Sequence, residues 1–542
     1  MAAIGTIEVD HEVRITAPNR VISRIRRRLT FDNPELKKAE GLGLDTRRIP
    51  PRLFYWTGEL DTQVTIPRGA LRLAMRAMKE SGVTPRWKPN VSKNHILPRP
   101  LSSLNVQLRP EYQVAAVDAL LANQQGMVVL PCGAGKTTIG VTAVLRSGYA
   151  ACVVVHTREL LTQWVERFVL IAGRRPRVIT ADASLEPLEP GEVSVAMVKT
   201  LHDAGDEADA FLKSVGALLV DEAQHVPAKM WSSVSQRCPA RHRWGLTATP
   251  ERSDGMDFLF DVLIGETVFS ETARSLIDWG YLKRPLIVPI RTEWEPSLDH
   301  YKPTLVCHRC GKVQRPPDFK ADVKIVKISR CRKCRGVVTE EMVQDRLTWS
   351  RAIAARGRNS DRAGLIALMM EIGIRRGRVG LCLASSNVAG EAILRALEDY
   401  SHVDACFVSS KTPKKERERA MDTLGQEGGY QALVATKLAE EGLDIPELDW
   451  VINEIGGKSG GNAKQRVGRA ARLGGAVTPV VIEPIDNART FERQWNQRRK
   501  AYVAEYGREA IFSDEPLSTF EGLEVIRMLS EEGCETKDSS GS

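Results

Sequence analysis

Two series of short apolar runs constrain the fold of this chain most strongly. The first series comprises residues 127–130, 151–155, 193–198 and 216–220. The second series comprises residues 379–384, 405–409, 431–436, 450–455 and 479–484. Amphipathic segments of helical length separate the runs, and such alternation is typical of parallel sheets with crossover helices. The sequence therefore predicts an α/β fold with two parallel-sheet halves.

The length of the chain leaves room for further domains beside these halves. At about 150 residues per domain, a chain of 542 residues has roughly three to four domains. A proline-rich stretch ends an N-terminal segment of alternating runs and one expected helix, which favours an α+β domain there. The expected parts are an N-terminal accessory domain at 1–100, a first lobe at 104–290, an insert at 295–345, a second lobe at 350–515 and a tail at 516–542.

The positive charge is concentrated in two of these parts. Residues 1–100, which include the cationic stretch 24–28, contain 19 Lys+Arg and 10 Asp+Glu. Residues 301–336 contain 11 Lys+Arg and two acids, so a net charge of +9 for the whole chain leaves about −9 for the remainder. Lysine and arginine contacts to phosphates release condensed counterions, which favours a polyanionic partner for the two basic modules. A solvated basic face is the alternative.

The sequence gives no signal for secretion or membrane insertion. Residues 1–13 contain acids and lack the apolar core of a signal peptide, and no run of 18 apolar residues occurs. Ten cysteines in 542 residues are too sparse for a disulfide scaffold. We therefore expect a cytoplasmic protein without a membrane partner.

A glycine-rich loop at 131–138 (PCGAGKTT) lies between an apolar strand and an apolar helix. Gly133 and Gly135 let main-chain N–H groups surround phosphate oxygens, Lys136 can reach the β- and γ-phosphates, and the Thr137 hydroxyl can bind Mg²⁺. A chance glycine turn is the alternative. The residues predicted to bind ATP here are Gly133, Ala134, Gly135, Lys136, Thr137 and Thr138.

A pair of carboxylates follows a later apolar strand directly. The run 216–220 leads into Asp221 and Glu222, at the carboxyl end of a predicted strand. Asp221 would hold Mg²⁺ through water, while Glu222 would orient and deprotonate the attacking water. A solvated loop is the commoner fate of such a pair. Because a phosphate loop precedes it, we predict ATP hydrolysis, with Lys136, Asp221 and Glu222 as catalytic residues.

Four cysteines in the predicted insert form a CxxC-x₂₀-CxxC array. Two such pairs can supply four thiolates to a tetrahedral Zn²⁺, and the few apolar residues nearby make metal binding the expected source of folding energy. The alternatives are unrelated buried cysteines, or a ribbon that binds no nucleic acid. The predicted Zn²⁺ ligands are Cys307, Cys310, Cys331 and Cys334.

Taken in order, the motifs of the first half resemble those of a superfamily 2 helicase of the DEAD/DEAH type, and the resemblance spans about 105–475. The resembling segments are 109–113 (RPEYQ), 156–164 (HTRELLTQW), 199–201 (KTL), 221–224 (DEAQ) and 245–250 (GLTATP). The resemblance implies that Gln113 contacts adenine and that Gln224 belongs to the catalytic set. It also implies nucleic-acid contacts at Thr157, Arg158 and Thr200.

The second half continues the same resemblance. The corresponding segments are 385–387 (SSN), 435–437 (ATK), 441–444 (EGLD) and 465–472 (QRVGRAAR). In the last segment Arg469 and Arg472 are three residues apart on a predicted helix, so both can point at a γ-phosphate as arginine fingers from the second lobe. The resemblance implies nucleic-acid contacts at Ser385 and Thr436 and nucleotide contacts at Gly442, Asp444 and Gln465.

Within the superfamily, residues 130–136 (LPCGAGK) and 465–472 are similar to the XPB branch, which includes UvsW-like enzymes of phages and bacteria. The resemblance implies two RecA-like lobes and a 3′-to-5′ DNA helicase or translocase that uses ATP and Mg²⁺ in repair, recombination or branch remodelling. It implies a bacterial or phage-infected cell as the setting. The alternatives are an RNA-remodelling helicase, a restriction-system motor, and an ATP-gated binding module that does not unwind.

Overall fold

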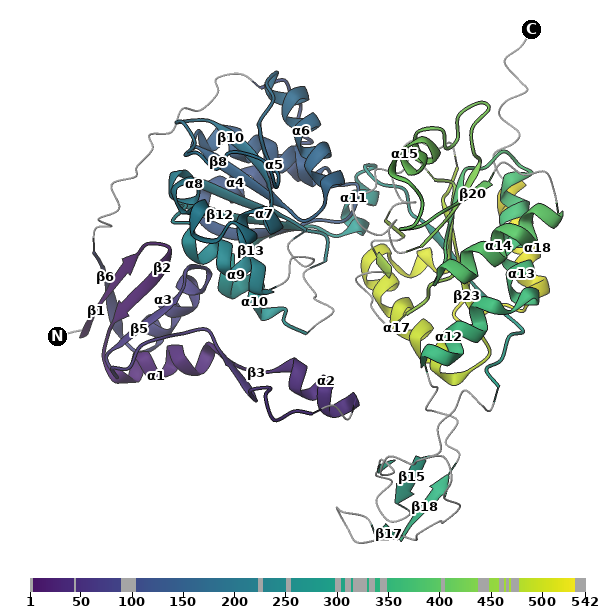
Figure 1. The fold of residues 1–542 in the computed structure, drawn as a ribbon, viewed down its shortest axis with the longest axis horizontal. Coiled ribbons are helices and arrows are strands. Elements are labelled where there is room, and N and C mark those ends of the chain that lie inside the picture. The colour runs from purple at the N-terminus through teal and green to yellow at the C-terminus, as the bar shows by residue number, and fades with distance from the viewer. Residues whose placement is uncertain are drawn as a thin grey trace. The chain divides into compact units, whose positions relative to one another are not determined.

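The computed structural model describes most of the two predicted lobes and of the N-terminal region (Figure 1). The described residues are 3–42, 45–88, 104–222, 228–249, 255–297, 304–307, 313–314, 329–330, 337–341, 349–400, 405–436, 448–457, 463–464, 467–468 and 477–531. The chain divides into two compact units, Met1–Leu282 and Lys283–Ser542. Within the described ranges, every helix is too short or too polar to cross a bilayer.

The first unit begins with a small mixed sheet in the order β5-β2-β1-β6. Its strands are β1 (Ala3–Val9), β2 (Glu12–Thr16), β5 (Gln63–Pro67) and β6 (Val83–Trp87). The helices of this region are α1 (Asn19–Arg28), α2 (Pro34–Leu42) and α3 (Leu71–Glu80), and a second pair of strands is β3 (Thr30–Asp32) and β4 (Arg52–Phe54). Apolar residues of β1, β2, α1 and α3 alternate with exposed ones, and the buried set forms the core of this part.

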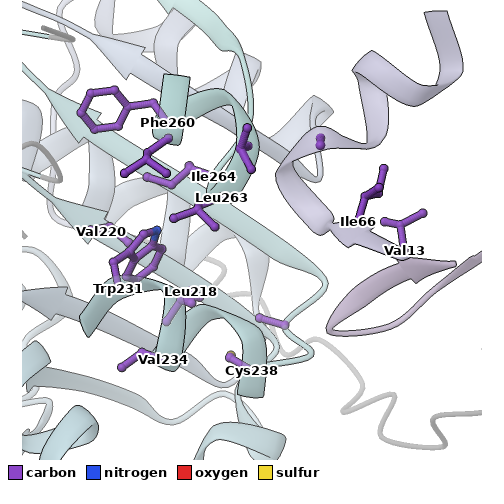
Figure 2. Close-up of a cluster of buried hydrophobic side chains, with 14 of the residues drawn as sticks. Val13, Ile66, Leu218, Val220, Trp231, Val234, Cys238, Phe260, Leu263 and Ile264 are labelled. Atoms are coloured by element: carbon purple, nitrogen blue, oxygen red, sulfur yellow. The ribbon is translucent and has the colours of Figure 1, made fainter. Parts of the chain in front are cut away.

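This N-terminal part packs on the parallel-sheet lobe of the same unit. The Arg68 guanidinium is buried and donates hydrogen bonds to the main-chain oxygens of Pro239 (3.1 Å) and Arg241 (2.9 Å). Next to it, a Cβ at Gly69 would lie 2.5 Å from the Val262 oxygen, so only glycine permits this close approach. Figure 2 labels apolar side chains from both sides of the buried cluster, namely Val13, Ile66, Leu218, Val220, Trp231, Val234, Cys238, Phe260, Leu263 and Ile264.

The cationic stretch 24–28 is partly used inside the N-terminal part. Arg24 (3.4 Å) and Arg28 (2.7 Å) form ion pairs with Glu80. Arg26 stacks over Trp56 at 4.6 Å and donates hydrogen bonds to main-chain oxygens of Gly58, Leu60 and Gln63. Three of the four arginines therefore have intramolecular partners, which narrows the polyanion surface that the sequence suggested.

The first lobe is a seven-stranded parallel sheet in the order β13-β7-β12-β11-β8-β10-β9. The strands are β7 (Gln125–Val129), β8 (Ala151–Val155), β9 (Arg177–Ile179), β10 (Val193–Met197), β11 (Ala217–Asp221), β12 (His242–Thr247) and β13 (Thr267–Ser270). The helices are α4 (Gln113–Ala122), α5 (Lys136–Ser147), α6 (Arg158–Ala172), α7 (Val198–Asp203), α8 (Asp209–Ser214), α9 (Ala228–Arg237), α10 (Phe258–Leu263) and α11 (Ala273–Asp278). The four apolar runs of the first series are β7, β8, β10 and β11, which confirms the predicted α/β rhythm.

The second lobe is a six-stranded parallel sheet in the order β14-β23-β22-β19-β21-β20. The strands are β14 (Leu286–Arg291), β19 (Gly380–Leu383), β20 (Ala405–Val408), β21 (Ala432–Ala435), β22 (Trp450–Asn453) and β23 (Val480–Ile485). The helices are α12 (Trp349–Arg358), α13 (Ser360–Ile374), α14 (Asn387–Tyr400), α15 (Lys414–Asp422), α17 (Arg489–Tyr506) and α18 (Thr519–Glu531). All five runs of the second series are strands of this sheet.

Two predicted boundaries differ from the structure. The run that forms β14 was expected to end the first lobe at residue 290, but β14 pairs with β23 in the second sheet. The predicted tail at 516–542 begins with helix α18, which buries Ile526 in the core of the second lobe. Gly522 of α18 packs on Ile290 of β14, where a Cβ would lie 2.8 Å from three Ile290 carbons. The strand and the helix thus support each other at one edge of the second sheet.

The predicted insert contributes short antiparallel strands. They are β15 (Thr304–Cys307), β16 (Val313–Gln314), β17 (Ser329–Arg330) and β18 (Val337–Glu341), in the order β16-β15-β18-β17. Cys307 is the last residue of β15. Cys310, Cys331 and Cys334 lie outside the described residues. In the part of the chain that is described, no three His, Cys, Asp or Glu side chains gather as a metal site.

Candidate nucleotide and nucleic-acid site

The predicted site residues of the first lobe lie at the carboxyl edge of its sheet. The phosphate loop follows β7, Asp221 ends β11, and the predicted nucleic-acid residues follow β8 and β10. In the strand order, β7 and β11 flank β12, while β8 and β10 are neighbours. Ligands of open parallel sheets bind at this edge. The nucleotide side and the nucleic-acid side therefore meet where β11 pairs with β8.

The phosphate loop is shaped by two glycines and held from below. Gly133 (φ 80°) and Gly135 (φ 78°) adopt left-handed backbone conformations, and Gly135 is the N-cap of α5. The main-chain oxygen of Ala134 accepts hydrogen bonds from the Tyr112 hydroxyl (2.7 Å) and the Gln113 amide (2.9 Å). A Cβ on Gly135 would lie 2.6 Å from Gln113 Nε2, so both the conformation and the space require glycine. The loop directs the N-terminus of a 12-residue helix outward, which suits phosphate.

Lys136 lies between this loop and the acidic pair. Its Nζ is 3.3 Å from the Leu130 oxygen and 3.4 Å from the Pro131 oxygen. The same Nζ is 3.9 Å from Glu222 Oε1. Lys136 and Glu222, which are 86 positions apart in sequence, are thus brought close together. Thr137 and Thr138 follow in the first turn of α5 and are half-buried.

The Asp221 carboxylate is buried and held by two neutral donors. Its Oδ2 accepts a hydrogen bond from Trp164 Nε1 at 2.7 Å, and its Oδ1 accepts one from the Glu222 main-chain N–H at 3.0 Å. Burial, together with the adjacent Glu222 carboxylate, raises the pKa of Asp221 to about 7. Among the described residues no guanidinium pairs with this buried carboxylate, and such a carboxylate suits a divalent cation.

Glu222 has an unusual backbone. Its φ is 46°, the left-handed region, which the other described non-glycine residues avoid. Such conformations cost about 1–3 kcal/mol and collect at functional sites. The strain turns the chain sharply after β11, while the Glu222 main-chain N–H still reaches the Leu246 oxygen of β12 at 3.0 Å.

The predicted nucleic-acid residues occupy helix starts after their strands. Thr157 is the N-cap of α6, and its hydroxyl accepts a hydrogen bond from the Leu160 N–H at 3.2 Å. Arg158 begins that helix and is exposed. Thr200 lies in α7 and is half-buried. These residues share the carboxyl edge with the phosphate loop, but their contact with nucleic acid stays a prediction.

In the second lobe, Ser385 and Thr436 follow β19 and β21, again at carboxyl ends of strands. The Thr436 N–H donates to the Val408 oxygen at 3.2 Å, and Thr436 is half-buried. The other second-lobe predictions, together with one from the first lobe, lie outside the described residues, and they are Gln224, Gly442, Asp444, Gln465, Arg469 and Arg472.

Sequence reasoning missed a buried ionic network at the same edge of the second sheet. Glu454, directly after β22, pairs with Arg356 (2.7 Å) and Arg362 (2.6 Å). Asp486 pairs with the same two arginines at 3.2 and 2.6 Å. Burial alone would raise the pKa of Glu454, but Arg356 and Arg362 outweigh it and hold the pKa at about 2. Glu454 Oε2 also accepts a hydrogen bond from the Ser385 N–H at 2.5 Å.

Two other features of the first lobe were also missed. Trp164 was quoted only as part of a motif, and nothing in sequence order signals its bond to Asp221. Tyr112, Trp279 and Tyr281 form an aromatic group beside the phosphate loop, with Tyr112 parallel to Trp279 at 6.1 Å. The sequence signal for this aromatic group was the spacing of Trp279 and Tyr281, because side chains two positions apart in a short loop can point to the same side.

Comparison with known proteins supports the same assignment. Residues 105–252 match the family described as type III restriction enzyme, res subunit, and residues 365–474 match the helicase conserved C-terminal domain. The DNA 3′-5′ translocase XPB2 of Sulfurisphaera tokodaii is 29% identical over 391 residues, which cover 69% of this chain and 81% of that protein. The putative DNA 3′-5′ helicase Rad25 of Halobacterium salinarum is 25% identical over 445 residues, which cover 80% of this chain and 64% of that protein.

A solved structure shares the fold. The fragment structure of a putative HsdR subunit of a type I restriction enzyme from Vibrio vulnificus YJ016 has a TM-score of 0.51 at 15% identity, over 89% of this chain and 82% of that one. The two family matches follow one another in sequence order on the two parallel-sheet lobes, and the sequence relatives carry the names XPB and Rad25. The comparisons therefore support the resemblance of this chain to superfamily 2 helicases of the XPB branch.

Proposed function

We propose that this chain is an ATP-dependent DNA translocase or helicase of 3′-to-5′ polarity that acts in repair, recombination or branch remodelling. The observation that carries the proposal is the meeting of Lys136, Asp221 and Glu222 at one edge of the first sheet, with Lys136 Nζ 3.9 Å from Glu222 Oε1. The polarity and the preference for DNA rest on the names of the relatives, which are DNA 3′-5′ translocases and helicases.

The residues at this edge divide the work of phosphate-bond hydrolysis. Loop N–H groups at Gly133 and Gly135 and the N-terminus of α5 bind phosphate oxygens, and Lys136 moves its ammonium from Glu222 to the γ-phosphate. Asp221 and the Thr137 hydroxyl would hold Mg²⁺, which neutralises charge on the phosphates when it is bound. Glu222, freed from Lys136, then orients a water molecule and accepts its proton.

The nucleic-acid side of the proposal uses residues one or two strands away. Thr157, Arg158 and Thr200 in the first lobe, and Ser385 and Thr436 in the second, would contact phosphates of one strand. Contacts to phosphates carry no base sequence, so the motor would act on many DNA sequences. Arg469 and Arg472 remain proposed arginine fingers of the second lobe, and Gln113 remains a proposed adenine contact.

Two accessory parts would select the DNA structure. The first is the N-terminal part, in which Arg27 is exposed on α1 while its neighbours are engaged within the domain. The second is a proposed Zn²⁺ ribbon, which is supported by the CxxC pairs and by antiparallel strands that bring Cys307 to a strand end. The segment between these strands is rich in basic residues, which suits a phosphate backbone.

The three alternatives differ in what stimulates ATP hydrolysis. An RNA-remodelling enzyme would respond to RNA, a restriction motor would need a nuclease partner, and a binding module would bind ATP without rapid turnover. The presence of Glu222 beside a complete phosphate loop disfavours the last. The names of the sequence relatives disfavour the first two.

The test is ATP turnover measured with single-stranded DNA, duplex, forks, four-way junctions and RNA of equal length. We expect at least one DNA to stimulate turnover about tenfold more than RNA does. Stimulation by RNA alone would contradict the proposal. Cytoplasmic location stays a prediction that this assay does not address.

A further inference from the structure

One buried side chain joins the nucleic-acid side of the first lobe to its magnesium side. Trp164 lies on α6, the helix that begins at Thr157 and Arg158, and its indole N–H donates to Asp221 at 2.7 Å. The indole is fully buried, with 0% of its surface exposed. This hydrogen bond fixes one oxygen of the side chain that would hold the cation.

The space for this indole depends on a glycine inside helix α5, which lowers the stability of that helix. Gly140 lies in the interior of α5, where glycine is about 1 kcal/mol less favourable than alanine. A Cβ at Gly140 would lie 2.5 Å from Trp164 Cη2 and 2.9 Å from Leu246 Cδ1. The helix that carries the phosphate loop thus packs directly against the indole, and Asp221 at the end of β11 accepts its N–H.

Both oxygens of Asp221 are consequently oriented. Oδ2 accepts from Trp164 and Oδ1 accepts from the Glu222 N–H, so rotation of the carboxylate would break both bonds. Indole can only donate, so it cannot exchange roles with the carboxylate. Trp164 and Asp221 are 57 positions apart in sequence. Trp164 lies on α6, which follows β8, and Asp221 is the last residue of β11, the strand that pairs with β8.

We propose that Trp164 is a positioning residue, which orients Asp221 toward the Mg²⁺–nucleotide and ties magnesium binding to the helix that begins at the strand-contacting residues. This proposal rests on the proposed function. Trp164 touches neither nucleotide nor water in the reaction, and it acts through Asp221. A shift of α6 on contact with nucleic acid moves the indole, and the carboxylate follows because the bond is direct.

The test compares Trp164→Phe with Trp244→Phe. Trp244 is also fully buried in this lobe, but its indole N–H donates to the Asn123 main-chain oxygen at 2.9 Å, away from the acidic pair. ADP affinity is measured with Mg²⁺ and with EDTA, using full-length protein. In Mg²⁺, we expect Trp164→Phe to bind ADP about tenfold more weakly than the wild type does. In EDTA, its ADP affinity should equal that of the wild type. We expect Trp244→Phe to match the wild type in both conditions.

A second arm adds single-stranded DNA and repeats the ADP titration. DNA should strengthen Mg²⁺–ADP binding in the wild type and in Trp244→Phe, and this gain should be lost in Trp164→Phe. A double-mutant cycle with Asp221→Asn is the further check, because Trp164→Phe should then have no additional effect on magnesium dependence. Gly140→Ala, which displaces the indole without removing its N–H, is combined with Asp221→Asn in the same kind of cycle and should likewise have no additional effect on magnesium dependence.

Three outcomes overturn the proposal. The first is wild-type magnesium dependence in Trp164→Phe, and the second is an equal loss in both tryptophan variants, which means packing alone. The third is an additive effect of Trp164→Phe in the Asp221→Asn background. Magnesium-dependent ADP binding by the wild type supports the proposed function whatever Trp164 does, so the two failures are distinguishable.

Discussion

Asp221 and Glu454 are two buried carboxylates at equivalent places in the two sheets, but they have different partners and their pKa values shift in opposite directions. Each lies at the carboxyl end of a parallel strand, Asp221 in the first lobe and Glu454 directly after β22 in the second. Neutral donors hold Asp221, and its pKa rises to about 7 because of burial and of Glu222. Two guanidinium groups hold Glu454, and they outweigh burial to lower its pKa to about 2.

The comparison distinguishes two roles of a buried carboxylate. The Asp221 carboxylate is available to bind a ligand, whereas the Glu454 carboxylate stabilises the fold through its arginine partners. A buried carboxylate without a paired cation destabilises the protein, and a bound cation relieves that cost. A buried carboxylate with paired cations is costly to remove, because the arginines then stay buried without a partner. We therefore expect changes at Asp221 to affect activity and changes at Glu454 to affect stability.

The largest expected effect is that of Asp221→Asn on ATP turnover. We expect DNA-stimulated hydrolysis to fall by about 10³-fold, because the magnesium ligand is lost while the shape is kept. The free energy of unfolding should stay the same or rise, because a buried charge is removed. Steady-state turnover and urea unfolding measure both quantities. Asp118→Asn, on an exposed position of α4, is the control and should change neither.

The reverse pattern is expected for Glu454→Gln. It leaves Arg356 and Arg362 short of a negative partner, so the free energy of unfolding should fall by about 3–5 kcal/mol at pH 7. Urea unfolding checks this. Glu371→Gln is the control: Glu371 is also buried, but its ion-pair partner among the described residues is Arg375, whose side chain is 66% exposed. Its replacement leaves no guanidinium buried without a partner and should cost under about 1 kcal/mol.

The pH dependence sharpens the same prediction. The pKa of Glu454 is lowered in the folded state from 4.5 to about 2, so its stabilising effect is fully present above pH 4.5. The effect is lost as pH falls from 4.5 toward 2. The stability gap between the wild type and Glu454→Gln should therefore shrink over that interval. A gap that stays constant below pH 4.5 contradicts the assignment of the pKa shift to the arginines.

The proposed Zn²⁺ ligands of the insert extend the comparison to a second cation site. Replacing Cys307 and Cys310 together by serine should weaken DNA binding by about tenfold and leave basal ATP turnover within about twofold. Titration with a zinc-sensitive dye should recover about one Zn²⁺ per wild-type chain and none from the variant. An equal loss of DNA binding and basal turnover would mean that the insert supports the motor itself.

The smallest effects are expected for two neighbouring arginines of α1, which should differ in whether they affect DNA binding or stability. Arg26 has its partners inside the domain, whereas Arg27 is exposed. Arg27→Ala should weaken DNA binding severalfold and lower the slope of log affinity against log salt by about 1, without a change in stability. Arg26→Ala should lower stability by about 1–2 kcal/mol. An unchanged salt slope in Arg27→Ala removes α1 from the DNA surface.

Local patterns predicted the fold well where strands are continuous apolar runs. Four of the seven strands of the first sheet, β7, β8, β10 and β11, and the phosphate loop followed from the spacing of apolar residues and glycines alone. The position of β14 did not follow, because its partner β23 lies about 190 residues later and no local pattern encodes that pairing. The run that forms β14 resembles those of the first series, so it was assigned to the wrong lobe.

The site shows the same division between local and distant information. Lys136, Asp221 and Glu222 were predicted because each follows a recognisable strand. The bond between Trp164 and Asp221 spans 57 positions, and the pair of Arg356 with Glu454 spans 98. The cationic stretch 24–28 was read as a free surface because Glu80, more than 50 positions later, supplies its partner. Charge is visible in sequence, but its neutralisation depends on tertiary contacts.

We propose that ATP is hydrolysed at the carboxyl edge of the first sheet, with Glu222 as the base. The most direct measurement is ATP turnover by Glu222→Gln in the presence of saturating single-stranded DNA, together with ATP affinity and thermal stability. We expect turnover to fall by about 10³-fold while affinity and stability stay at wild-type values. Turnover within tenfold of the wild type would contradict the role of Glu222 as the base.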